Sequence, residues 1–98
     1  MEKDKFVEIW KLHDDQYCQS DKIKNKLCES TDLAAFMLIH KFMIDKVADI
    51  IISCEHDIIY LAPIDNLDLK RIKESDIIDL IRCGIRYEDD FDCLSMFV

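Results

Sequence analysis

Cysteine and histidine side chains are the residues of this chain that could bind a metal ion or act as nucleophiles. Five cysteines and three histidines occur, and their closest pair is Cys54 with His56. Structural zinc sites usually combine C-x2-4-C and H-x3-5-H pairs, and neither spacing is found here. A zinc site would have to draw on remote residues such as His13, Cys18 and Cys83. We therefore expect no metal ion and no cofactor.

Covalent catalysis and phosphate binding have equally little support. A catalytic thiolate needs a positive neighbourhood, whereas Cys54 and His56 stand beside the negative charges of Glu55 and Asp57. An odd number of widely spaced cysteines is typical of free thiols in a reducing compartment. Gly84 is the only glycine, which excludes the glycine-rich loops that hold phosphate groups. We expect a protein that is not an enzyme.

Acidic residues are concentrated in the second half of the chain. Residues 1–48 carry 9 Asp and Glu against 8 Lys and Arg, and residues 49–98 carry 12 against 5, so the formal net charge of −8 divides into −1 and −7. Two stretches, 48–69 and 87–98, contain no Lys or Arg. Such a field repels nucleic acid and anionic membranes and attracts basic protein surfaces.

The last of these stretches has an alternating pattern. If residues 87–98 are extended, Glu88, Asp90 and Asp92 share one face at intervals of about 6.8 Å, roughly twice the rise per phosphate of a DNA strand. The pattern then predicts a carboxylate row that mimics phosphate spacing. Its opposite face would close the core with Tyr87, Phe91, Cys93 and Phe97. The alternative is a solvated turn that keeps an edge strand from aggregating.

Carboxylates of the two stretches, with one tyrosine, are the candidate partner-binding residues. A basic protein surface is the expected partner, and the rings of Tyr60, Tyr87 and Phe91 are candidate anchors. No direct binding of nucleic acid or membrane is expected. The predicted partner-binding residues are Glu55, Asp57, Asp65, Asp68, Tyr87, Glu88, Asp89, Asp90 and Asp92.

A single compact α+β domain over residues 1–98 is expected to position these side chains. Half of the residues are hydrophobic, which suffices for one core, and a single Gly and a single Pro leave little for an all-β fold. The expected order is αααββαββ, with N-terminal helices packed on a small antiparallel sheet.

Three helices are predicted in the first half from apolar spacing. The first covers 4–17, where Phe6, Ile9 and Trp10 share a face. A short second helix covers 20–28 and exposes Lys22, Lys24 and Lys26. The third runs from Leu33 to Ala48 and is expected to be the most buried element. Its apolar residues are Leu33, Phe36, Met37, Ile39, Phe42, Met43, Ile44 and Val47.

Short β-branched runs predict strands in the second half. Residues 50–52 and 58–61 should form a hairpin that is covered on both faces, and Pro63 should end its second strand. Ser75 should cap a helix over 76–83 that Gly84 ends with positive φ. Strands over 85–87 and 93–98 complete the predicted sheet.

The longest apolar run, Leu33 to Ile39, is only seven residues, and the N-terminal residues do not resemble a signal peptide. We therefore expect a soluble protein. The small size, the acidic charge and the Glu88–Asp92 cluster resemble the acidic inhibitors that phages and mobile elements use against bacterial defence systems, such as anti-CRISPR and anti-restriction proteins. That resemblance implies an inhibitor in the cytoplasm of a bacterial host, docked on the nucleic-acid-binding surface of a defence nuclease complex.

Two alternatives belong to other classes of protein. The apolar segment 94–98 could mediate self-association of a regulatory or assembly module as a homodimer. The lysines between Lys22 and Lys26 could instead serve a helical DNA-binding regulator, although a net charge of −8 opposes DNA binding.

Overall fold

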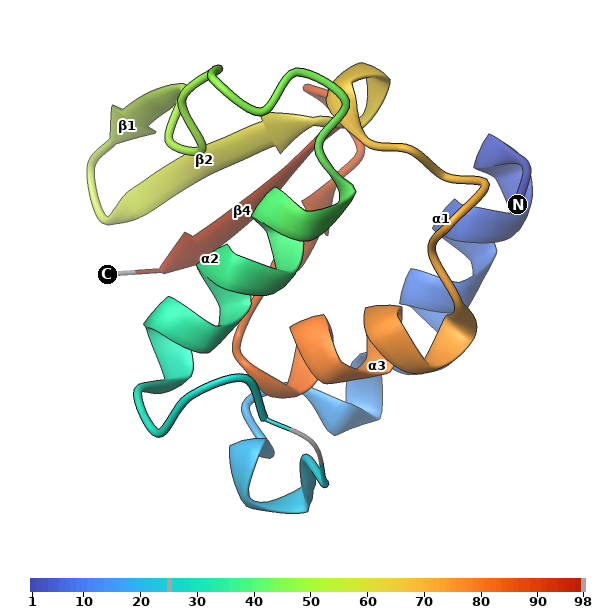
Figure 1. Cartoon of the computed structure of the whole chain (residues 1–98), viewed down its shortest axis with the longest axis vertical. Coiled ribbons are helices and arrows are strands. Elements are labelled where there is room, and N and C mark those ends of the chain that lie inside the picture. Colours follow the sequence, from blue (N-terminus) through green and yellow to red (C-terminus); the bar gives the residue numbers. More distant parts are fainter. Residues whose placement is uncertain (25, 98) are drawn as a thin grey trace.

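The elements follow the predicted order with one helix fewer. The computed structural model describes residues 1–24 and 26–97. Within them lie helices α1 (Lys3–Leu12), α2 (Thr31–Phe42) and α3 (Glu74–Arg82), strands β1 (Ser53–Glu55), β2 (Ile58–Pro63), β3 (Arg86–Glu88) and β4 (Cys93–Phe97), and 3-10 turns η1 (Asp14–Gln16), η2 (Ser20–Lys22) and η3 (Ile64–Asn66). The strands form an antiparallel sheet in the order β1-β2-β4-β3 (Figure 1). The α+β class is confirmed.

The helices pack on one face of the sheet. Leu61 and Leu94 are fully buried there and join the core cluster that all three helices supply. Strand pairing places Tyr60 opposite Ser95, and Ser95 opposite Arg86, on the other face. None of these three residues belongs to the core cluster. We call this second face the outer face of the sheet; it is the side away from the core.

Helix α1 has the amphipathic character that its spacing predicts, but it is shorter. Its buried residues are Phe6, Ile9 and Trp10. The ring of Phe6 meets the ring of Tyr87 edge-on, with centroids 6.3 Å apart, which joins the helix to β3. The helix ends at Leu12, and Nε2 of His13 then lies 2.7 Å from Oε2 of Glu74 at the start of α3.

The prediction of a helix through Ala48 is wrong, because α2 ends at Phe42. Met43 has an extended backbone and forms an isolated antiparallel bridge with Leu67. The amide of Ile44 donates to the carbonyl oxygen of Asn66 at 2.8 Å. The backbone here therefore bonds to the end of η3 and to the residues that follow it, which replaces the intrahelical bonds of a longer helix.

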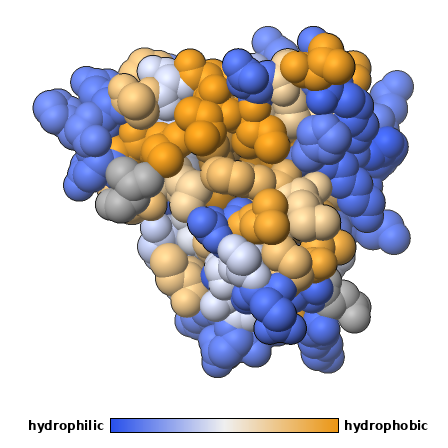
Figure 2. Space-filling view, turned by 60° about the vertical axis from the view of Figure 1, so that its left-hand side comes forward, coloured by the Kyte–Doolittle hydropathy of each residue, from blue (hydrophilic) through white to orange (hydrophobic). Residues whose placement is uncertain are grey.

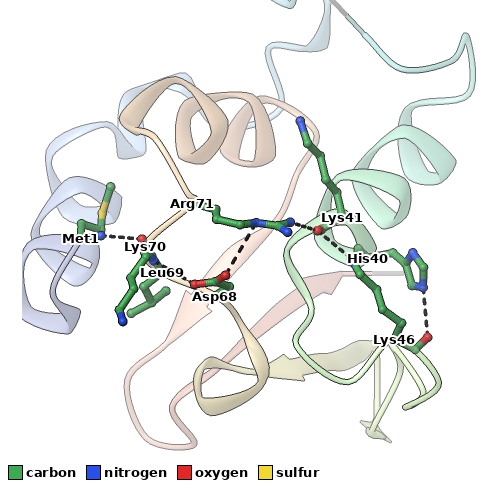
Figure 3. Close-up of polar contacts among 8 residues, drawn as sticks. All are labelled: Met1, His40, Lys41, Lys46, Asp68, Leu69, Lys70 and Arg71. Carbon is green, nitrogen blue, oxygen red and sulfur yellow. Dashed lines mark hydrogen bonds and ion pairs between the residues drawn. The ribbon is translucent and has the colours of Figure 1, made fainter.

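Cationic side chains close the C-terminal end of α2 (Figure 3). The ammonium of Lys46 donates to the carbonyl oxygens of His40 and Lys41, each at 2.7 Å. The guanidinium of Arg71 also donates to the carbonyl of Lys41, and it lies 3.7 Å from Asp68. The carbonyl of His40 also accepts the amide of Met43, and both carbonyls lie at the negative end of the helix dipole. Lys46 thus stabilises the C-terminal end of α2, which comes earlier in the chain than predicted.

The predicted burial of this segment is only partly correct. Ile39, Phe42 and Met43 are buried, whereas four other apolar residues are exposed: Leu33, Met37, Ile44 and Val47. The last two are exposed because the chain after Phe42 leaves the helix. The expected strand over 50–52 is also displaced, since β1 begins at Ser53, and Ile51 and Ile52 are exposed instead of covered.

The predicted helix over 20–28 is reduced to the 3-10 turn η2. Ile23 already has an extended backbone. The ammonium of Lys26 turns back to the carbonyl oxygen of Glu29 at 3.0 Å and to Oγ1 of Thr31 at 2.8 Å. Asn25, which falls in the predicted helix, lies outside the described residues.

The remaining boundaries are close to their predictions. β2 ends at Pro63, and Gly84 follows α3 with φ +92°, both as predicted. Helix α3 begins at Glu74, ahead of the predicted cap, and Oδ2 of Asp76 accepts the amide of Lys73 at 2.9 Å. β3 and β4 fall within one residue of expectation; Val98 lies outside the described residues. In the described part of the chain, every helix is too short or too polar to cross a membrane.

Candidate functional site

The two acidic turns lie at opposite ends of the sheet. Ile58, next to the turn between β1 and β2, pairs with Phe97, whereas Pro63 pairs with Cys93. The turn between β1 and β2 carries Asp57, with Glu55 just before it, and the turn between β3 and β4 carries Asp89, Asp90 and Asp92. The candidate residues therefore do not form one continuous strip.

The predicted carboxylate row along an extended 87–98 is wrong. Glu88 pairs with Cys93, so that residues 89–92 form a turn between the two strands, with a φ of +51° at Asp92. Four carboxylates within five residues repel one another along an extended strand, and Asp, which occupies three of these positions, is common in turns. Because the row does not form, the predicted match to phosphate spacing is also wrong.

Asp92 is committed to contacts inside the molecule. Its Oδ1 accepts a hydrogen bond of 2.7 Å from the hydroxyl of Tyr87, and its Oδ2 pairs with Lys3. The Lys3 ammonium, followed by the Tyr87 hydroxyl, holds the pKa of Asp92 below its usual value. Burial, and then the bond to Asp92, raises the pKa of Tyr87. The negative charge of Asp65 also raises the pKa of Lys3, although by less than the bond to Asp92 does.

Asp68 belongs to a different place, the network at the end of α2. Besides its contact with Arg71, its Oδ1 accepts the amide of Lys70 at 3.3 Å (Figure 3). Asp68, Tyr87 and Asp92 are thus held by neighbours in the fold, which makes them poor candidates for partner contacts, whereas Asp65 is exposed in η3.

An aromatic pair marks the outer face of the sheet. The rings of Tyr60 and Phe91 meet edge-on, with centroids 5.2 Å apart and planes at 69°. Phe91 comes from the turn between β3 and β4 and is 62% exposed. The pair therefore exposes an aromatic edge to solvent.

Three carboxylates act on the Tyr60 hydroxyl of this pair. The pKa of Tyr60 is raised, first by partial burial of its hydroxyl and then by the charges of Glu55, Glu88 and Asp90. These acidic residues come from β1, from β3 and from the following turn, so only the folded sheet gathers them. We call the set Glu55, Tyr60, Glu88, Asp90 and Phe91 the acidic aromatic patch.

Hydrogen bonds within the outer face hold one side of the patch in place. Ser95 is buried, and its hydroxyl donates to Oε1 of Glu88 at 2.8 Å. The guanidinium of Arg86 lies 3.8 Å from the same oxygen of Glu88 and 4.8 Å above the centroid of the Phe97 ring. Glu88 is therefore oriented from two sides, while Glu55 and Asp90 are exposed.

The aromatic residues of 87–98 are distributed differently from the prediction. Tyr87 packs against the core and Cys93 is buried, as expected, but Phe91 and Phe97 are exposed. The turn shifts the alternation, so that Phe91 no longer shares a face with Tyr87. A run of Glu, Asp and Asp before Phe91 was the signal for this turn.

The cysteines and histidines that could bind a metal ion or act as nucleophiles do not gather at one site. All five cysteines are free thiols. Cys54 is exposed in β1, and His56 follows in the turn with φ +56°. Across residues 1–24 and 26–97, His, Cys, Asp and Glu nowhere gather in a group of three that could hold a metal ion.

Comparison of this chain with protein-family models, with curated proteins and with solved structures gave no match, so its function has to be argued from the acidic aromatic patch itself.

Proposed function

We propose that this protein is a small acidic inhibitor that docks the acidic aromatic patch on a basic surface of a nucleic-acid-binding protein. The observation that carries the proposal is the edge contact of Tyr60 and Phe91 at 5.2 Å within the field of Glu55, Glu88 and Asp90. Aromatic anchors inside a polar rim are the usual arrangement of energetic hot spots at protein interfaces.

The charge of the whole chain favours the same kind of partner. A net charge of −8 accelerates encounter with a basic surface, and carboxylates beside the aromatic anchors then fix the orientation. A basic surface covered in this way is closed to nucleic acid. In its specific form the proposal is an anti-CRISPR-like or anti-restriction-like inhibitor that phages or mobile elements encode and that acts in the bacterial cytoplasm.

The folded patch changes which residues carry the proposal. Glu55, Glu88 and Asp90 remain as partner contacts, with Asp57 and Asp89 at the ends of the sheet. Of the three candidate anchors, Tyr60 and Phe91 remain, and Tyr87 does not because it packs against the core. A helical DNA-binding regulator is not supported, because the lysine-bearing segment after α1 forms a 3-10 turn where that function needs a helix.

A capture experiment tests the proposal. Immobilised protein is exposed to bacterial lysates, captured proteins are identified by mass spectrometry, and the leading candidate is purified for binding titrations with and without its nucleic acid. Capture alone decides nothing. The proposal expects nucleic acid and this protein to compete for the same partner, with binding that weakens steeply as salt increases.

Variants of exposed residues locate the contact. Phe91→Ala and the double variant Glu55→Lys with Asp90→Lys should each weaken binding at least tenfold. The matched control is Asp21→Lys with Glu29→Lys, which makes the same charge change at exposed positions outside the sheet. Glu88 is avoided because it bonds Ser95. Equal losses in control and test variants, or no loss in either, would contradict the proposed patch.

A further inference from the structure

A second surface, on the side of the molecule that carries α2, has a different character from the acidic aromatic patch. Figure 2 shows apolar side chains gathered in a continuous band on this side. The exposed apolar residues of α2 and of the chain that leads into β1 are Leu33, Met37, Ile44, Val47, Ile51 and Ile52. We call them the α2 face. It lies apart from the outer face of the sheet, since the buried side of α2 packs in the core.

The exposure of these side chains is large. Val47 is 92% exposed and Ile44 65%, and the other four are close to half exposed. Together they offer several hundred Å² of apolar surface, on the order of the ~800 Å² that each partner contributes to a standard interface. A shallow hollow of about 380 Å³ lies within this face, between Met37, Phe36 and Ile50. The α2 face therefore has both the apolar area and the surface shape that an interface needs.

The charges near this face are balanced, unlike those of the rest of the chain. Residues 31–52 contain three Asp and two Lys, a formal charge of −1 out of −8. Exposed charges of both signs, Lys41 and Asp49, stand in this segment. A strongly basic partner would gain little electrostatic attraction at the α2 face. A second copy meets little repulsion, because the acidic outer faces point away from such a contact and opposite charges can pair twice across a two-fold axis.

The edge of the sheet adds a further self-complementary element. β1 is an edge strand that pairs only with β2 in the described chain. It follows directly on Ile51 and Ile52, and it is only three residues long. Two copies related by a two-fold axis can bring their β1 edges together in antiparallel orientation, as isologous contacts require.

From area, charge balance and edge strand together, we infer that the α2 face is the interface of a symmetric homodimer of this chain. The dimer covers the apolar side chains of both copies and leaves Tyr60, Glu88, Asp90 and Phe91 of both acidic aromatic patches free, whereas Glu55 at the end of β1 lies beside the contact. This inference does not depend on the proposed function, since it is argued from the apolar residues of the α2 face.

Sedimentation equilibrium and size-exclusion chromatography with light scattering, over protein concentrations from about 1 to 500 µM, test the inference. The wild-type protein should shift from the monomer mass to twice that mass within this range. The double variant Ile44→Lys with Val47→Lys should weaken association at least tenfold. Both positions are exposed, so the variant keeps the core, and circular dichroism should show an unchanged fold.

The matched control is Leu12→Lys at the end of α1, because Leu12 is 65% exposed, as Ile44 is. Added lysines lower the net negative charge of each copy, so a loss of association cannot come from greater overall repulsion between the two acidic copies. A wild-type protein that stays monomeric throughout, as it would if a different protein covers this face, overturns the inference. So does a dimer that the Ile44 and Val47 changes leave intact, or one that Leu12→Lys weakens equally.

Discussion

The hydroxyl of Tyr87 donates a hydrogen bond of 2.7 Å to Oδ1 of Asp92, across the turn that joins β3 to β4. The other carboxylate oxygen of Asp92 pairs with Lys3 at the start of α1. The carboxylate of Asp92 thus joins the start of α1 to the turn between β3 and β4. This arrangement keeps Asp92 away from the outer face and lets Phe91 stand beside Tyr60.

Replacement of Tyr87 by Phe should reduce the free energy of unfolding by about 1 kcal/mol, because one hydrogen bond is lost while the ring stays in the core. The pH dependence should change as well. The folded-state pKa of Tyr87 is raised, so its contribution is present below about pH 10 and is lost as pH rises further. The pKa of Asp92 is lowered, so its contribution is present above about pH 4 and is lost on acidification.

Urea unfolding at pH 3 to 11 measures both effects. In Tyr87→Phe the loss of stability at alkaline pH should be smaller than in the wild type, though not absent, because Tyr17, Tyr60 and Cys83 also have raised pKa values. Tyr60→Phe is the control, since the hydroxyl of Tyr60 has no hydrogen-bond partner among the described residues. Equal destabilisation by the two variants at neutral pH would speak against the bond to Asp92.

Replacement of Lys46 by Met should destabilise the protein by about 1 kcal/mol, because the carbonyls at the end of α2 lose a cationic donor. Thermal unfolding followed by circular dichroism measures the change. Lys70→Met removes the same charge from an exposed lysine whose ammonium has no partner in the described chain, so its effect should be within about 0.5 kcal/mol. A Lys46 variant as stable as the Lys70 variant would show that the cap contributes nothing.

Native alkylation should separate the five thiols. Burial raises the pKa of Cys83 to about 11, so only about one molecule in a thousand carries its thiolate at pH 8. Cys93 is buried and its pKa is also raised by burial. Iodoacetamide at pH 8, followed by peptide mass spectrometry, should therefore modify the exposed Cys18 and Cys54 first. In urea all five should react at similar rates; rapid modification of Cys83 in the folded protein would contradict its placement.

The elements that the sequence predicted well are those with a strong local signal. The apolar spacing of Phe6, Ile9 and Trp10 indicated α1, Pro63 indicated the end of β2, and Gly84 indicated the end of α3. Each of these depends on the chemistry of one residue or on one helical period, which neighbours far along the chain do not alter.

Errors arose where distant segments compete for the same backbone groups. Residues 43–48 have the apolar pattern of a helix, but Ile44 bonds to Asn66 and Lys46 caps the helix that precedes it. The acidic residues after Glu88 suit a strand face by alternation, yet Tyr87 and Lys3 hold Asp92 in a turn. Local periodicity contains no information about such partners.

By itself, the sequence determined the α+β class, most element positions and an acidic second half, because hydrophobic period, turn residues and charge are written along the chain. Only the tertiary structure decided which acidic residues stand together. Pairing of β4 with both β2 and β3 brings Glu88 and Asp90 toward Tyr60, and the end of α2 at Phe42 exposes Ile44 and Val47. Both depend on hydrogen bonds between segments far apart in the chain.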